Sequence, residues 1–268
     1  MINFKKYGKR CLSLFLAASM ILMPAVQTFA EEETAAATTD STQTAEEDRE
    51  TQRQKCYAIA PDSNSVENWP QGPATYADSA IVMDMNSGAV LYSKQIEKKH
   101  YPASITKLLT TLVALDNAEL TDTVEFSQDS ISFLEYGDAH IGMTPGEQIS
   151  MEDALYAVLL ASANEVSYAV AESVGKKMGG GYDTFIQAMN DESEKLGCTG
   201  SHWTNANGLH DEQHYTTAHD MARIGAAVYQ KKAFRTISQS LSHTIPVTNL
   251  VNEERTFQQK HKMLWPQN

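Results

Sequence analysis

The sequence predicts a mixed α/β sandwich, an α+β arrangement in which a sheet is interrupted by a helical insertion. Three observations support this prediction. Residues 79–93 look like two strands around a turn, residues 104–230 contain several segments with helical spacing, and residues 242–247 again look like a strand. We expect the functional site in the cleft between the sheet-backed helix and the helical lobe.

The first predicted element is a β-hairpin. Ser79 to Met85 and Ala89 to Ser93 are rich in apolar residues, and Asn86-Ser87-Gly88 lies between them. A three-residue hairpin loop commonly needs one left-handed residue, and glycine adopts that conformation without steric cost. We therefore expect Gly88 at the left-handed position.

The helical segments have recognisable beginnings and ends. One helix is expected from Ser104 to Asn117, and the capping-box pattern Ser150-Met-Glu-Asp153 opens another that ends near Ser162 to Asn164. The spacing of apolar residues predicts three more helices, over 165–177, 182–196 and 217–230. Residues 118–149 contain turn signals and are expected to be irregular.

The first thirty residues have the composition of an export signal. Lys5 to Arg10 is basic, Leu12 to Val26 is apolar, and Thr28-Phe29-Ala30 places small residues where a signal peptidase cuts. A membrane span needs about 20 apolar residues, and this run is shorter. We expect a signal peptide over 1–30 and an exported protein, in the cell wall or at the outer face of the cytoplasmic membrane.

The composition after residue 30 indicates two further segments. Residues 31–55 are rich in Thr, Ala, Glu and Gln, which predicts a disordered acidic linker, and residues 56–268 are long enough for one domain. The formal net charge of −13 argues against nucleic acid as a partner. Cys56 and Cys198 could pair outside the cytoplasm, but a single pair at ordinary spacing favours two free thiols.

Ser104 and Lys107 are the first candidate catalytic pair. They stand three residues apart in Pro102-Ala-Ser-Ile-Thr-Lys107, at the start of an apolar run. Residues i and i+3 share one face of a helix, so the amine can reach the hydroxyl. A serine is a weak nucleophile until a base takes its proton, and a lysine in a dry site can lose its own proton and serve as that base.

Ser162 and Asn164 form the second candidate motif, at the junction of two predicted helices. A hydroxyl and an amide there can bond a lysine, relay a proton and hold a substrate amide. Read alone, S-x-N is a common pattern that favours a helix cap over a catalytic motif.

Together these motifs resemble the low-molecular-weight penicillin-binding proteins, the serine-type D-alanyl-D-alanine carboxypeptidases. The resemblance runs from about Ala77 to Pro266. It is carried by the hairpin with Asn86-Ser-Gly88 and by Tyr101-Pro-Ala-Ser-Ile-Thr-Lys107, Ser162-Ala-Asn164, Trp203-Thr-Asn-Ala-Asn-Gly-Leu-His-Asp211 and His214-Tyr-Thr-Thr-Ala-His-Asp-Met-Ala222. Two of the family's three signatures, S-x-x-K and S-x-N, are therefore present.

The resemblance implies a sandwich of the penicillin-binding and β-lactamase type, and a role for each motif residue. Ser104 would be the acyl nucleophile, Lys107 its base, Ser162 a proton relay, and Asn164 a contact to the substrate's peptide amide. The implied reaction removes the terminal D-alanine from pentapeptide stems of peptidoglycan through an acyl-enzyme, without a cofactor or metal. β-Lactams would acylate Ser104 as inhibitors.

The third signature is missing from the sequence given. No Lys-Thr-Gly or Lys-Ser-Gly triad occurs before Asn268, although His261-Lys-Met-Leu-Trp-Pro266 resembles the stretch that precedes it in the family. We therefore expect residues 56–268 to be the N-terminal part of a catalytic domain, incomplete at its C-terminus. A family member would contact the membrane surface only through a C-terminal segment absent here.

Three alternatives remain open. A catalytically incomplete chain could bind peptidoglycan without turnover. A class A β-lactamase shares S-x-x-K but needs S-D-N, and position 163 is Ala. His210 and His214 have the H-x-x-x-H spacing of zinc peptidases, yet Asn207-Gly-Leu209 predicts a loop there, whereas that motif needs a helix.

Overall fold

The computed structural model describes residues 46–266 and divides the chain into two units, 1–55 and 56–268. In the first unit, residues 46–55 are helical, whereas we expected a disordered linker over 31–55. This stretch holds strong helix formers and an ion pair between Arg53 and Glu50, three residues apart, which supports a helix without a core. The expected signal peptide and residues 31–45 lie outside the described residues.

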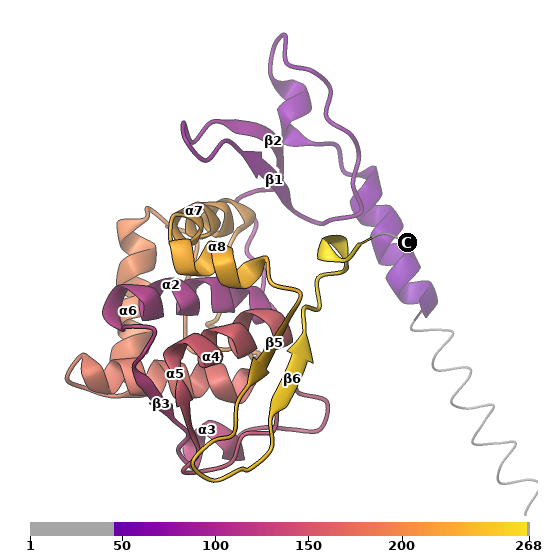
Figure 1. Ribbon diagram of the computed structural model, residues 1–268. Helices are drawn as coiled ribbons and strands as arrows, with labels where there is room; N and C mark the ends of the chain where they lie inside the picture. Colours follow the sequence, from indigo (N-terminus) through magenta and orange to yellow (C-terminus); the bar gives the residue numbers. More distant parts are fainter. Residues whose placement is uncertain (1–45, 267–268) are drawn as a thin grey trace, which may run out of the picture. The chain divides into compact units, whose positions relative to one another are not determined.

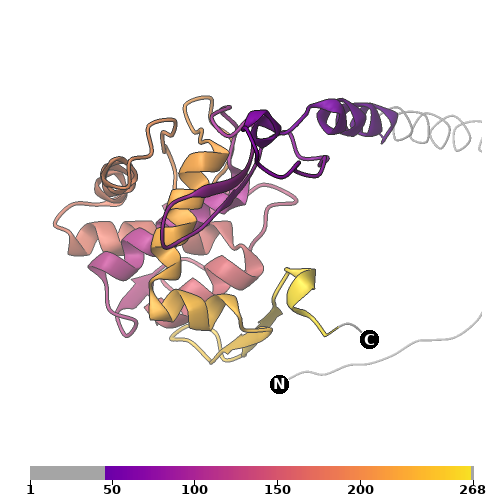
Figure 2. The same ribbon diagram turned by 90° about the horizontal axis from the view of Figure 1, so that it is seen from above.

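The second unit begins with the predicted hairpin. A short 3₁₀ helix, η1 (Asp62–Ser65), precedes strands β1 (Ala80–Met83) and β2 (Val90–Lys94), which pair antiparallel. Gly88 in their loop has φ +72°, as expected. In Figures 1 and 2 this ribbon lies beside helix α7 (Ala218–Tyr229), and β1 contacts that helix.

Lys94 at the end of β2 fixes the segment that precedes the hairpin. Its side chain is completely buried, and Nζ donates to the carbonyl oxygens of Cys56, Thr75 and Ala77 at 2.6, 2.9 and 2.8 Å. The three N–H groups of an ammonium thus meet three acceptors, which offsets the cost of burying it.

The nucleophile segment is a 3₁₀ turn followed by a helix. Residues Ala103–Thr106 form η2 and Lys107–Asn117 form α2, so the predicted helix is α-helical only from Lys107 onward. The apolar face of α2 is buried against helices α5, α6 and α7, where we expected a sheet to cover it. Helices supply this cover because the β1–β2 ribbon contacts α7 instead.

The helix start predicted at Ser150 is confirmed, with Ser150 as an N-cap; the Asp153 side chain bonds the Ser150 hydroxyl and not its backbone N–H, so the reciprocal half of a capping box is not formed. Ser150 Oγ accepts from the backbone N–H of Asp153 at 3.1 Å, and helix α4 (Met151–Tyr156) starts there. It continues as a π-helical turn, η3 (Ala157–Ala161), and then α5 (Asn164–Lys177) and α6 (Tyr182–Lys195) follow. The helices predicted over 165–177 and 182–196 therefore form within two residues of their expected bounds.

Two elements near the C-terminal end were not predicted. Helix α8 (Lys232–Ser238) follows α7 directly, beyond the helix expected over 217–230. Strand β5 (Ser242–Ile245) was expected, but its partner β6 (Arg255–Gln258) was not. A short 3₁₀ helix, η4 (Lys262–Leu264), follows.

The mixed α/β class is confirmed, but the described strands do not form one interrupted sheet. They form three separate antiparallel ribbons, β1–β2, β5–β6 and a pair within the stretch expected to be irregular, β3 (Thr123–Glu125) with β4 (Gln148–Ser150). Helix α3 (Asp129–Ser132) lies in the same stretch. β3, β4 and α3 have only three or four residues each, too few for a periodic pattern to indicate them.

Glu147 ties the loop after α3 to the β5–β6 ribbon. Its carboxylate is completely buried and accepts from Arg255 Nη1 at 2.6 Å, from Thr248 Oγ1 at 2.7 Å and from the backbone N–H of Thr144 at 3.0 Å. Burial alone would raise the pKa of Glu147, but Arg255, Thr248 and Thr144 together hold that pKa below its usual value. The carboxylate is therefore ionised and paired.

Two further observations complete the description. Cys56 and Cys198 are both buried and unbonded to each other, in line with the expectation of free thiols. Among residues 46–266, no helix combines the length and apolar character needed to cross a bilayer.

We predict that Arg255→Met destabilises the protein by about 3 kcal/mol at pH 7, because it leaves the Glu147 carboxylate buried without its cation. Chemical denaturation measures the loss. Since the pKa of Glu147 is lowered by folding, its stabilising contribution is present above the unfolded-state pKa and disappears as the pH falls through the folded-state pKa.

Lys195→Met is the matched control, because it removes an exposed ion pair with Glu192 and should cost less than about 0.5 kcal/mol. Equal, small losses for both variants at pH 7 would contradict the role assigned to the buried pair.

Candidate active site

Ser104 lies in the exposed 3₁₀ turn that precedes α2. The residue before it, Ala103, has φ +49°, a left-handed conformation that disfavours any side chain. Such strain persists only where the surroundings over-determine the backbone, and it concentrates at functional sites. The turn presents the Ser104 hydroxyl at the start of the helix, near the positive end of the helix dipole.

Lys107 joins three segments that are far apart in the sequence. Its side chain is 3% exposed, and Nζ lies 3.2 Å from Ser104 Oγ, 2.8 Å from Asn164 Oδ1 and 2.7 Å from the backbone oxygen of Asn207. The predicted reach of the lysine to the serine, and the predicted bond between the lysine and the S-x-N motif, are both present.

Each of these three partners can donate or only accept a hydrogen bond, and this determines which of them a neutral Lys107 amine donates to and which one faces its lone pair. A neutral lysine amine has two N–H donors and one lone pair. Asn164 Oδ1 and the Asn207 carbonyl can only accept, and they make the two shorter contacts. The lone pair is then left for Ser104, which is the one partner with a proton to give. This is the geometry that a general base requires.

Burial favours the neutral form of this amine. Burial has the largest effect, the positive charge of Lys260 acts in the same direction, Glu165 and Asp138 oppose both, and together they bring the pKa of Lys107 to about 7. A substantial fraction of Lys107 is therefore uncharged at neutral pH, whereas an exposed lysine is almost fully protonated.

Asn164 is fixed at the first residue of α5. Its backbone N–H donates to the carbonyl oxygen of Ala139 at 2.8 Å, and its neighbour Glu165 accepts from the N–H of Ile141 at 2.7 Å through Oε1. Glu165 is completely buried, its Oε2 has no partner in the described part of the chain, and burial raises the pKa of this carboxyl. These contacts hold the 139–141 loop against the amide that receives Lys107.

Ser162 ends the π-helical turn in a left-handed conformation, with φ 60° and ψ 33°. It is half-buried and two residues before Asn164, as its motif requires, but within residues 46–266 its hydroxyl makes no hydrogen bond to Ser104, Lys107 or Asn164. The structure thus brings together Ser104, Lys107 and Asn164, and the relay role of Ser162 remains a prediction.

Sequence reasoning missed the third side of the site, the loop around Asn207. Gly208 in this loop has φ +86°, and a Cβ added there would lie 1.9 Å from the carbonyl oxygen of Ala103. Only glycine lets the loop approach the nucleophile turn this closely. The available signal was the turn-forming pair Asn207-Gly208, but a backbone oxygen that receives a lysine has no sequence signature.

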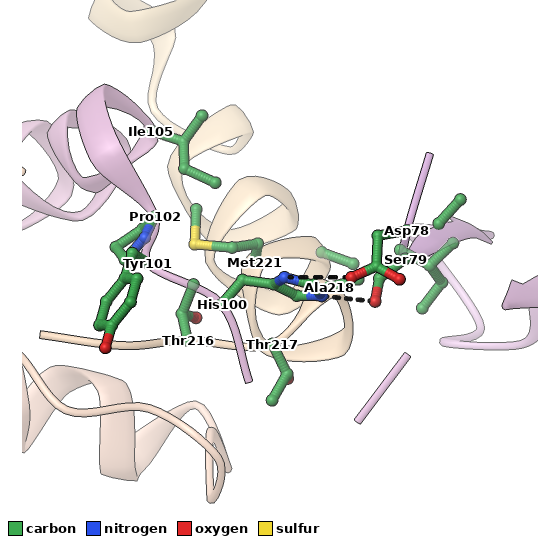
Figure 3. Close-up of a pocket in the computed structure, with 13 residues that line it drawn as sticks. Asp78, Ser79, His100, Tyr101, Pro102, Ile105, Thr216, Thr217, Ala218 and Met221 are labelled. Carbon is green, nitrogen blue, oxygen red and sulfur yellow. Dashed lines mark hydrogen bonds and ion pairs between the residues drawn. The ribbon is translucent and has the colours of Figure 1, made fainter. Parts of the chain in front are cut away.

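A cavity beside the nucleophile segment is distinct from the catalytic centre. It has a volume of about 570 Å³ and is lined by Pro102 and Ile105 from the nucleophile segment, with β1 and the start of α7 on its other sides. Figure 3 shows His100 in its wall, with one ring nitrogen facing Asp78 and the other, Nε2, lying 2.7 Å from Ser79 Oγ. None of the four predicted site residues lines it.

The zinc alternative is not supported. Within residues 46–266 no three His, Cys, Asp or Glu side chains are grouped so that they could hold a metal ion. The ring of His210 packs edge-on against Tyr101, and His214 is buried and bonded to Thr106. Residues 207–209 form a loop, as predicted.

Comparison with known proteins agrees with this geometry. Residues 66–268 match a family model described as D-alanyl-D-alanine carboxypeptidase. The chain is 34% identical over 151 residues to the Bacillus subtilis D-alanyl-D-alanine carboxypeptidase DacF, covering 54% of this chain and 37% of that protein. It is 31% identical over 195 residues to DacB2 of Mycobacterium tuberculosis, covering 70% and 63%.

A solved structure extends the comparison to the fold. The crystal structure of a D-alanyl-D-alanine carboxypeptidase from Mycobacterium tuberculosis superimposes with a TM-score of 0.63 at 30% identity, over 77% of this chain and 73% of that one. The chain spans about half the length of the curated relatives it matches. From the family match and from the arrangement of Ser104, Lys107 and Asn164 we conclude that this chain belongs to the D-alanyl-D-alanine carboxypeptidase family.

Proposed function

We propose that the protein is an exported serine hydrolase that removes the terminal D-alanine from peptidoglycan stem peptides through an acyl-enzyme on Ser104. The observation that carries this proposal is the contact of a buried amine, Lys107 Nζ, with Ser104 Oγ at 3.2 Å, while its two other partners are acceptors only. The family membership supplies the substrate class.

The first step is proton transfer. The lone pair of the neutral Lys107 amine takes the proton of Ser104, and Oγ attacks the carbonyl carbon of the D-Ala–D-Ala bond. The negative charge that develops on the carbonyl oxygen is favoured by the N–H groups at the start of the nucleophile helix. When the carbon–nitrogen bond breaks, the leaving D-alanine needs a proton, and we assign its delivery to Ser162, which would donate its own proton and receive the one that Lys107 took from Ser104.

Asn164 has two tasks in this scheme. Its Oδ1 orients the Lys107 amine, and its Nδ2 remains available to hold a peptide carbonyl of the substrate. Water then hydrolyses the acyl-enzyme. A β-lactam carbonyl offers the same target to Ser104 and would leave it acylated, whereas a β-lactamase would release the product rapidly.

We predict that Ser104→Ala abolishes covalent labelling of the full-length protein by a fluorescent penicillin, because no other serine lies beside the Lys107 amine among the described residues. Gel fluorescence and mass spectrometry of the labelled peptide measure this. Ser65→Ala, which also replaces an exposed serine in a 3₁₀ turn, is the matched control and should label normally.

Labelling of Ser104→Ala at the wild-type level would refute the nucleophile. Rapid release of hydrolysed penicillin by the wild-type protein would favour the β-lactamase alternative.

We predict that the rate of acylation by penicillin rises with pH through an inflection near 7, because only the neutral amine can accept the Ser104 proton. The sign follows from the lowered pKa of Lys107, since the amine is charged below that pH and free above it. Stopped-flow acylation measured from pH 5 to 9 tests this.

Lys107→Arg keeps a positive charge that does not titrate, and it should acylate about 10²–10⁴ times more slowly. Lys176→Arg, on the exposed end of α5, is the control and should behave as the wild type. A flat pH profile, or normal acylation by Lys107→Arg, would remove Lys107 from the mechanism.

A further inference from the structure

The side chain of His214 is hydrogen-bonded to the 3₁₀ turn that carries Ser104, Ala103–Thr106. Its side chain is 2% exposed, and its Nε2 lies 2.8 Å from Oγ1 of Thr106, the residue immediately before Lys107. Its other ring nitrogen, Nδ1, accepts the backbone N–H of Thr204 at 3.0 Å. The imidazole therefore joins the Ser104 turn to the loop that starts at Thr204.

These two contacts fix the tautomer of the ring. A backbone N–H can only donate, so Nδ1 of His214 carries a lone pair and no proton. A neutral imidazole has its one proton on the other nitrogen, so Nε2–H donates to Thr106 Oγ1. The Trp203 ring meets the His214 ring edge-on at 5.4 Å between centroids and closes the site around it.

The loop from Thr204 to Gly208 carries the acceptors of the nucleophile helix. The oxygen of Ala206 accepts from Thr110 Oγ1 at 2.7 Å, and that of Asn207 accepts from Lys107 Nζ at 2.7 Å. Any shift of this loop along α2 therefore moves the acceptor that orients the Lys107 amine. Among these contacts, the His214 side chain is the one that lies outside the nucleophile segment and the Thr204–Gly208 loop and is hydrogen-bonded to both.

We propose that His214 is a positioning residue for acyl transfer, which as a neutral imidazole locks the Ser104 turn to the Thr204–Gly208 loop and thereby aims the Lys107 amine at Ser104. This inference rests on the proposed function, because it assigns His214 a part in that reaction.

The electrostatic surroundings keep the ring neutral. Burial has the largest effect, Asp211 opposes it, His202 acts in the same direction as burial, and together they bring the pKa of His214 to about 4. Across the range in which Lys107 titrates, His214 therefore carries one proton. Protonation of Nδ1 would place its N–H opposite the backbone N–H of Thr204. Two donors cannot bond each other, so the hydrogen bond between His214 and Thr204 would be lost.

A substitution at Thr106 tests the proposal, because it can remove the hydrogen bond to His214 Nε2 while the His214 side chain is retained. Thr106→Val removes Oγ1 and keeps the side-chain shape, so the acylation rate constant should fall about tenfold or more, as expected for a buried donor left without its partner. The binding constant of penicillin should not change. The pH inflection should move above 7, because a displaced Asn207 carbonyl opens the amine to water.

Two further variants separate positioning from packing. Thr106→Ser restores the hydroxyl and should keep at least about a third of the wild-type acylation rate. Thr111→Val is the matched control, since Thr111 is a buried threonine of α2 whose Oγ1 has no hydrogen-bond partner in the described part of the chain. It should acylate as the wild type does, with the same pH inflection.

Nitrogen-15 nuclear magnetic resonance spectra of the His214 ring report which ring nitrogen is protonated. They test the two hydrogen bonds directly and do not depend on activity. The inference expects a protonated Nε2 and an unprotonated Nδ1 between pH 6 and 8. The opposite tautomer, or a ring that titrates in this range, would overturn it.

The outcomes separate the two proposals. If the wild-type protein labels but Thr106→Val matches Thr111→Val in rate and pH inflection, the positioning role fails and the proposed function stands. If the wild-type protein does not label at all, the proposed function fails, and the role of His214 in acyl transfer fails with it.

Discussion

The site depends on one constraint, the burial of the Lys107 amine between two oxygens that can only accept hydrogen bonds. A buried ammonium without a carboxylate partner costs several kcal/mol, so desolvation lowers its pKa to about 7. The neutral amine then has a lone pair, and Ser104 is the partner with a proton to give. The same atoms around an exposed lysine would give a fixed positive charge and no base.

Contacts from neighbouring loops hold the Asn164 Oδ1 and Asn207 carbonyl oxygens in place. Asn164 is anchored by the Ala139 carbonyl and by the loop that Glu165 binds at Ile141. The Asn207 carbonyl is held by close packing of Gly208 on Ala103. Left-handed backbone at Ala103 and Ser162, one beside each motif, indicates that packing elsewhere stabilises strained turns where the chemistry is expected. Buried polar contacts, rather than a deep cavity, therefore define the site.

The sequence was a good guide where a signal is local. Gly88 in its hairpin and the N-cap at Ser150 lie where expected, because turn and cap chemistry depend on neighbouring residues. The contact of Lys107 with both Ser104 and Asn164 was also predictable, although only the family resemblance made the second motif persuasive. The Asn207 carbonyl and the buried His214 were not, since any residue has a backbone oxygen and a polar loop has no periodicity. The single interrupted sheet was wrong within the described residues, because strands with only four or five residues do not reveal their partners.

Direct titration of the Lys107 amine tests the central claim most directly. Nuclear magnetic resonance of lysine labelled with carbon-13 at Cε, in the protein without substrate, would follow each amine with pH, and the signal absent from Lys107→Arg identifies the one of interest. The account predicts a titration near pH 7 for this amine. A titration near 10.5, the ordinary value for lysine, would mean that Lys107 stays charged and cannot activate Ser104 as a base.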